Sequence, residues 1–201
     1  MSINLEKGQT IDLSKDKGLK SLEFGLGWSE AEKNKEAKGF WGKMKNALSG
    51  GEIDLDASIL MTGPDGKALD TVYFGKMKSS CCSIIHGGDD RAGGGEGDNE
   101  TIKVDLSMIP ETIDHLVLTV NSFSGEKFSE LKSAYGRIND DSGKEHARYT
   151  LTEMGAYTAL VVGVASRKGS NWSFKAVGKL CDGRTVSQLK SVAKDIVREV
   201  R

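Results

Sequence analysis

Apolar and polar residues alternate with a period of two, or form short β-branched runs, over much of this chain. Both patterns are typical of strands whose side chains pack against a core on one or both faces of a sheet. The segments that fit are 22–26, 53–61, 71–74, 81–85, 101–106, 115–123, 134–138, 147–151, 157–165 and 172–177. About ten short strands joined by close turns predict a mainly β protein, a β-sandwich of two antiparallel sheets.

Turn chemistry separates several of these segments. In Gly63-Pro64-Asp65-Gly66, the proline presets φ and a glycine can take a positive φ, so a tight turn is expected. The stretches 141–143 and 168–171 have the composition of hairpin tips.

Two segments depart from the β pattern. From Thr185 onward the apolar residues recur at spacings of three and four, which predicts a C-terminal helix that packs on the sandwich. Residues 30–48 place Phe40, Met44 and Leu48 at successive i+4 positions among many lysines, which predicts a short inserted helix. That helix either meets an anionic membrane surface or an acidic partner, or docks on its own domain through Phe40 and Trp41.

Composition places the chain among ordinary globular proteins. Its 201 residues, 37% hydrophobic and 28% charged, predict one domain over 1–201 with the helical insertion at 29–50. The net charge of -1 gives no general attraction to nucleic acid. The chain has no apolar run of membrane-spanning length and no export signal, so we expect a cytoplasmic protein. Its three cysteines suggest neither a disulfide framework nor a zinc site.

The stretch 86–100 holds five carboxylates and six glycines, and it carries the candidate chemistry. Like charges this close repel one another unless something neutralises them, and glycines let the backbone turn oxygens toward a common point. All the candidate ligands are oxygens, without a coherent His or Cys set, which favours a hard cation. Calcium is the first choice and magnesium the second.

On the residues alone, a solvated acidic loop explains the same composition. Spacing excludes two other sites. An EF-hand loop that began at Asp89 would have Arg91 and Gly93 at its third and fifth positions, where oxygen ligands are required. A phosphate-binding loop would not interleave its glycines with carboxylates, which repel phosphate.

The motif Gly88-Asp-Asp-Arg-Ala-Gly-Gly-Gly-Glu-Gly-Asp-Asn-Glu100, followed by Ile102-Lys-Val-Asp-Leu106, closely resembles the signature of the TerD tellurium-resistance and general stress proteins. Other stretches agree in order: Gly25-Leu-Gly-Trp28, Asp54-Leu-Asp-Ala-Ser58, Ala147-Arg-Tyr149 and Trp172-Ser-Phe-Lys-Ala-Val-Gly178. The resemblance implies a bacterial, cytoplasmic, calcium-binding β-sandwich of the stress response, without established enzymatic activity and with a protein partner in that system.

The resemblance also implies a ligand set for one or two calcium ions. The implied ligands are Asp54, Asp56, Asp89, Asp90, Asp98, Asn99 and Glu100. In a strand, residues i and i+2 point to the same side, so Asp54 and Asp56 can share one cation while Leu55 faces the core. Family members usually carry an aspartate where this chain has Ser29, so a ligand of a second ion is expected to be missing.

Three functions remain in view. The first is a non-enzymatic module in which calcium orders the loops and creates a surface for a protein partner. The second is a metal-dependent hydrolase, which needs a general base and an open metal position. The three histidines, His86, His115 and His146, form no recognisable catalytic set with a nucleophile. The third is a calcium-dependent membrane binder that uses residues 30–48.

Overall fold

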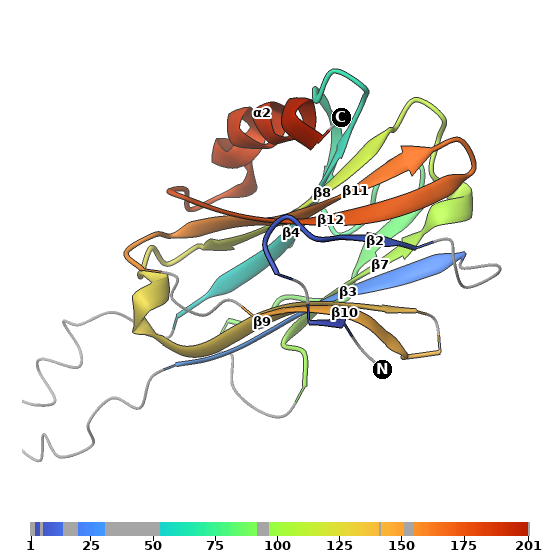
Figure 1. The fold of residues 1–201 in the computed structure, drawn as a ribbon. Coiled ribbons are helices and arrows are strands. Elements are labelled where there is room, and N and C mark those ends of the chain that lie inside the picture. The colour runs from blue at the N-terminus through green and yellow to red at the C-terminus, as the bar shows by residue number, and fades with distance from the viewer. Residues whose placement is uncertain are drawn as a thin grey trace, which may run out of the picture.

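Two β-sheets pack face to face, and one helix covers the outer face of the second sheet (Figure 1). The computed structural model describes residues 3–4, 6–13, 20–30, 53–91, 97–140, 142–150 and 155–200. The predicted β-sandwich with a C-terminal helix is confirmed. In this described part, no helix combines the length and apolar character needed to cross a membrane.

Sheet A contains six strands in the order β1-β10-β9-β3-β7-β6. Their bounds are β1 (Ile3–Asn4), β10 (Glu145–Thr150), β9 (Leu131–Asp140), β3 (Ser21–Glu30), β7 (Glu100–Asp105) and β6 (Ile84–His86). Neighbours run antiparallel except β1, which pairs with β10 in parallel.

Sheet B contains six strands in the order β2-β12-β11-β8-β4-β5, all antiparallel to their neighbours. Their bounds are β2 (Thr10–Asp12), β12 (Asn171–Cys181), β11 (Ala159–Lys168), β8 (His115–Ser122), β4 (Leu55–Thr62) and β5 (Ala68–Val72). The edge strand β5 pairs with β4 only between Ile59 and Thr62, so the first residues of β4 have no strand on that side among the described residues.

Strand β4 is buried on both faces, and its alternation assigns each face a different neighbour. Leu55, Ala57 and Ile59 belong to the core between the two sheets. Leu60, on the other face, packs in a second apolar cluster with residues of the C-terminal helix α2 (Lys190–Val200), including Ile196. The apolar stripe of α2 is therefore buried against the outside of sheet B.

Each of the ten predicted strand segments overlaps a strand of the structure, with ends that differ by a few residues. The strands β1 and β2 were not predicted. A short 3-10 helix, η3 (Val186–Leu189), precedes α2, so the helical region begins where the spacing of apolar residues indicated. The turn at 63–66 forms as predicted, with Gly66 at φ 76° and its N–H donating to the carbonyl of Gly63.

The predicted inserted helix falls almost wholly outside the described residues. Glu30 is the last residue of β3, so the strand, and not a helix, occupies that position. Residues 31–52 and 92–96 belong to the undescribed part of the chain, so the helix over 30–48 and the middle of the glycine loop stay predictions.

Candidate metal site

Asp54 directly precedes β4 and Asp56 is its second residue, where β5 does not cover the strand. Leu55 between them is fully buried in the core between the sheets. Because neighbouring residues of a strand point to opposite faces, Asp54 and Asp56 share the other face. Asp56 is only 2% exposed, although a carboxylate is rarely buried without a partner.

Asp89, from the loop that follows β6, joins this pair. One carboxylate oxygen from each of Asp54, Asp56 and Asp89 lies within 4.8 Å of the other two. Oδ1 of Asp54 is buried and has no hydrogen-bond partner. A buried acceptor without a partner is costly, so this oxygen needs a ligand that the protein itself does not supply.

Glu100, the first residue of β7, joins the group from sheet A. Its Oε2 accepts a hydrogen bond of 2.7 Å from the N–H of Ala57, on the part of β4 that β5 leaves uncovered. Its Oε1 accepts a longer one of 3.4 Å from the N–H of Asp90. The carboxylate thus joins both sheets and the glycine loop at one end of the sandwich.

His86 lies on the inner side of this group. Its Nε2 is 3.6 Å from Oε2 of Glu100, and both side chains are fully buried. Its Nδ1 accepts a hydrogen bond from the N–H of Gly88, which fixes the ring and places the proton of the neutral imidazole on Nε2. His86 is therefore closed off from solvent, and its Nε2 lies near Glu100 without a hydrogen-bond partner among the described residues.

The crowding of carboxylates raises two pKa values. Burial, followed by repulsion from Asp89 and Glu100, raises the pKa of Asp54 from 3.8 to about 6. Burial, followed by repulsion from Glu100 and Asp54, raises the pKa of Asp56 from 3.8 to about 7. Negative charge at this end of the sandwich is therefore only partly compensated by the protein.

Two neighbours provide that partial compensation. Arg91 forms an ion pair of 3.2 Å with Asp89 and lowers the pKa of Asp54, but its side chain is 81% exposed, so water screens its charge. Asn121 of β8 donates a 3.0 Å hydrogen bond to Oδ2 of Asp56. The sequence analysis missed Asn121, because its place opposite Asp56 follows from the register of β4 and β8.

Asp90 and Asn99 connect the two ends of the glycine loop. Nδ2 of Asn99 donates a 3.1 Å hydrogen bond to Oδ2 of Asp90. Oδ1 of Asn99 accepts a 2.8 Å bond from the N–H of Trp28, and its own N–H donates to the carbonyl of Leu26. Asn99 thus attaches the loop to β3, and its side-chain oxygen already has a protein donor.

Asp98 lies apart from the group of three aspartates. Its carboxylate forms an ion pair with Arg137 of β9, at 2.8 Å, and accepts a 3.1 Å hydrogen bond from the hydroxyl of Tyr135. It packs over the backbone of Gly25, where an added Cβ would come within 2.0 Å of a carboxylate oxygen. The glycine at position 25 is thus required by this close approach, and the charge of Asp98 is neutralised on the outer side of sheet A.

The donor set fits a hard divalent cation. The three converging groups are carboxylates, and the buried Oδ1 of Asp54 and the raised pKa values of Asp54 and Asp56 indicate oxygens that would gain from a positive charge. Asp54, Asp56 and Asp89 would hold the ion, with Glu100 beside them.

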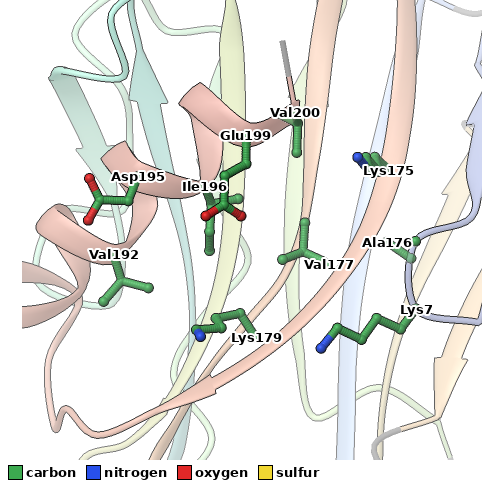
Figure 2. A pocket seen from close by; sticks show the side chains of 11 residues that line it. Lys7, Lys175, Ala176, Val177, Lys179, Val192, Asp195, Ile196, Glu199 and Val200 are labelled. Atoms are coloured by element: carbon green, nitrogen blue, oxygen red, sulfur yellow. The ribbon is translucent and has the colours of Figure 1, made fainter.

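A separate groove of about 520 Å³ lies between α2 and β12 (Figure 2). Lys7, Lys175 and Lys179 line it opposite Asp195 and Glu199 of α2. Valines and Ile196 of the second apolar cluster form its floor. None of these charged groups is buried without a partner, so the carboxylate group at the start of β4 is the better candidate for ion binding.

Comparison with known proteins gives one family and several relatives. The model of the TerD domain matches residues 1–194. A tellurium resistance protein TerZ of Serratia marcescens is 42% identical over 98% of both chains. The stress response protein SCP2 of Bacillus subtilis (strain 168) is 41% identical, over 89% of this chain and 92% of the relative.

A solved structure agrees with the architecture. The crystal structure of a homologue of telluride resistance protein (TerD) from Streptomyces coelicolor A3(2) superposes with a TM-score of 0.70. It covers 88% of this chain and 98% of the other, at 18% identity. At that identity the likeness establishes the fold alone.

Proposed function

The chain belongs to the TerD domain family, and from this membership and the carboxylate group we propose that it is a non-enzymatic calcium-binding protein of the tellurium-resistance and stress-response type. The observation that carries the proposal is the convergence of Asp54, Asp56 and Asp89 around a buried carboxylate oxygen without a partner. Calcium binds oxygen ligands, several of them charged, in flexible geometry, and this end of the sandwich offers such a set.

Calcium is favoured over magnesium by the nature of the ligands. Magnesium keeps several waters and demands near-octahedral geometry, whereas calcium accepts six to eight oxygens from strands and loops together. Here the ligands would be Asp54 and Asp56, just before and within β4, and Asp89 of the glycine-rich loop. Ion binding would neutralise the repulsion between these groups and hold the loop against β4.

The second part of the proposal is an interaction role. The loop that contributes Asp89 also contains the exposed Arg91, so an ion bound beneath it would fix the shape of an exposed surface. We infer that this ordered surface binds a protein partner of the stress system. Residues 30–48 are the candidate for a second contact with that partner or with an anionic membrane surface.

The histidines support a non-enzymatic role over a hydrolase. His86 is buried against Glu100, Nδ1 of His115 lies 2.9 Å from the hydroxyl of Ser166, and Nε2 of His146 lies 2.8 Å from Asp140. His115 and His146 thus have side-chain partners, whereas Nε2 of His86 is buried without one in the described part of the chain. The ring of His86, the histidine nearest Glu100, is fully buried, so it offers no exposed nitrogen to take a proton from a water.

Titration calorimetry of metal-free protein with calcium and with magnesium tests the proposal. We expect a saturable calcium event and weaker magnesium binding. At a free calcium concentration of about one hundred times the dissociation constant, binding should raise the free energy of unfolding by about 2.7 kcal/mol. The proposal fails if folded protein gives no calcium event and calcium leaves the unfolding transition unchanged.

A further inference from the structure

Cys81 and Cys82 lie at the tip of a short hairpin that leads into β6, away from the carboxylate group. The N–H of Ser79 donates to the carbonyl of Ile84, at 3.0 Å, and the N–H of Cys82 donates to the carbonyl of Ser79, at 2.9 Å. An isolated bridge between Lys78 and Ile85 continues the pairing. The two cysteines therefore lie in a turn that backbone hydrogen bonds hold in place, and neither forms a disulfide.

Two serines on the same hairpin surround the thiol of Cys81. Its Sγ is 2.9 Å from the hydroxyl of Ser83 and 3.5 Å from that of Ser79. Both serines are nearly inaccessible to solvent, at 2% and 3% exposure. A thiolate only accepts hydrogen bonds, so two sheltered hydroxyls that can donate to Cys81 stabilise its ionised form.

The three cysteines of the chain differ in their surroundings. Partial burial raises the pKa of Cys81, but hydrogen bonds from Ser83 and Ser79 outweigh this and lower it overall. Burial and the neighbouring Asp182 raise the pKa of Cys181. Cys82 is exposed, whereas Cys81 is half-buried. Exposure alone would make Cys82 the first thiol to react, while thiolate stabilisation favours Cys81.

We propose that Cys81 and Cys82 form a site of reversible oxidation, in which Cys81 is the thiol that reacts with a peroxide and Cys82 resolves the product. In the first step the Cys81 thiolate attacks one peroxide oxygen. An S–O bond forms, the O–O bond breaks, and the leaving hydroxide takes a proton to become water. Sulfur is oxidised by two electrons to the sulfenic acid, and the peroxide is reduced.

In the second step the sulfur of Cys82 attacks the sulfenic sulfur of Cys81. An S–S bond forms, the S–O bond breaks, and the leaving hydroxide takes the proton that the Cys82 thiol loses, which gives a second water. Adjacent Cα atoms are only about 3.8 Å apart, which is closer than in relaxed disulfides. The product is therefore strained and easily reduced, so a dithiol reductant returns it to two thiols. This modification is independent of calcium binding.

The test exposes the full chain to equimolar hydrogen peroxide, alkylates the remaining free thiols and identifies the products by mass spectrometry over time. We expect Cys81 to lose its free thiol first, Cys82 to follow, and the peptide that holds both to become lighter by two hydrogens in a monomeric protein. Dithiothreitol should reverse the change. First reaction at Cys82 or Cys181, or a disulfide between two chains, would overturn the proposal.

Two variants separate the roles of the groups. Ser83→Ala removes the closer hydroxyl and should slow the reaction of Cys81 several-fold at neutral pH. Less of the thiol is then ionised, and the higher nucleophilicity of the remaining thiolate offsets only part of that loss. Cys82→Ser should leave the first step intact and make Cys81 accumulate as a sulfenic acid that dimedone traps. The far-ultraviolet circular dichroism of each variant serves as the folding control. An unchanged rate in Ser83→Ala, or no trapped sulfenic acid in Cys82→Ser, would contradict the assignment.

Discussion

Asp56 and Asp98 are both buried acids of this sandwich, and the protein treats them in opposite ways. Asp98 is neutralised by Arg137 and by the hydroxyl of Tyr135 on the outer side of sheet A. Asp56 has no ion pair among the described residues, only the amide of Asn121 and three nearby carboxylates, and its pKa rises to about 7. Asp98, which is paired with an arginine, holds its loop against sheet A. Acids that lie together without such a partner can instead bind a cation.

The largest effect on calcium affinity is expected from a change at Asp56, which has no cationic partner in the part of the chain that the structure describes. Asp56→Asn keeps the shape of the side chain and the hydrogen bond from Asn121, but it removes one charge from the group around the ion. Calcium affinity should fall roughly tenfold or more, equivalent to about 1.4 kcal/mol of binding free energy. Titration calorimetry measures this change.

Asp195→Asn makes the same chemical change on the exposed side of α2 and serves as the control. It should leave the calcium isotherm unaltered. If Asp56→Asn binds calcium as tightly as the wild type, Asp56 is not a ligand. The proposed difference in role between Asp56 and Asp98 would then be wrong.

The second effect is a dependence on pH. The pKa values of Asp54 and Asp56 are about 6 and about 7 in the folded, metal-free protein, against 3.8 for an unperturbed aspartate. The folded state therefore binds these protons more tightly than the unfolded state does. Their contribution to stability is fully present below about pH 4 and is lost as pH rises through 6 and 7.

Calcium competes with these protons, so at a fixed calcium concentration its stabilising effect should be small at pH 5 and large at pH 8. Urea unfolding at both pH values, with calcium and with chelator, measures the difference. Asp56→Asn should flatten this dependence. A calcium effect that is equal at the two pH values would mean that the raised pKa values do not belong to the ion site.

A moderate effect, on stability and not on calcium binding, is expected at the ion pair between Asp98 and Arg137. Arg137→Ala removes the ion-pair partner of Asp98, whose side chain is nearly buried. The loss should lower the free energy of unfolding by about 1 to 3 kcal/mol. Calcium affinity should change only a few-fold, since Asp98 lies outside the group of three aspartates. Arg137→Lys, which restores a positive charge, should recover part of the stability. If Arg137→Ala weakens calcium as much as Asp56→Asn does, Asp98 and its partner act at the ion.

The smallest effect is expected at Ser29, where the family resemblance led us to expect an aspartate. Its hydroxyl is 2.8 Å from the hydroxyl of Ser133 on β9, a partner outside the carboxylate group. An aspartate there would add a partly exposed charge that water and salt screen. We therefore expect superimposable calcium isotherms for the wild type and Ser29→Asp. A tighter or additional calcium event in the variant would instead reveal a second site depleted in this chain.

Several features could be predicted from the sequence because they depend on local pattern. Alternation placed Leu55 in the core and Asp54 and Asp56 on one side of β4. The spacing of apolar residues located α2. The strands β1 and β2, of two and three residues, are too short to show a period, and pairing with distant strands creates them.

The division between Asp56 and Asp98 depends on contacts that pattern does not contain. The sequence puts Asp98 beside Asn99 and Glu100 in one acidic run, which suggests that all three act together. Arg137 reaches Asp98 because β9 pairs with β3 and places Arg137 opposite Gly25. Asn121 reaches Asp56 in the same way, through the register of β4 and β8. Such long-range pairings decide which acid keeps its charge exposed to an ion.

The most direct test compares the unfolding free energies of the wild type and Asp56→Asn at pH 8, each with chelator and with saturating calcium. If a bound cation neutralises the repulsion among these carboxylates, Asp56→Asn should be more stable than the wild type without metal, because one repelling charge is gone. With calcium the variant should be the less stable protein, because one ligand is gone. The account predicts this reversal of order. A variant that is less stable than the wild type by the same amount in both conditions would show that Asp56 has only a structural role, and would contradict it.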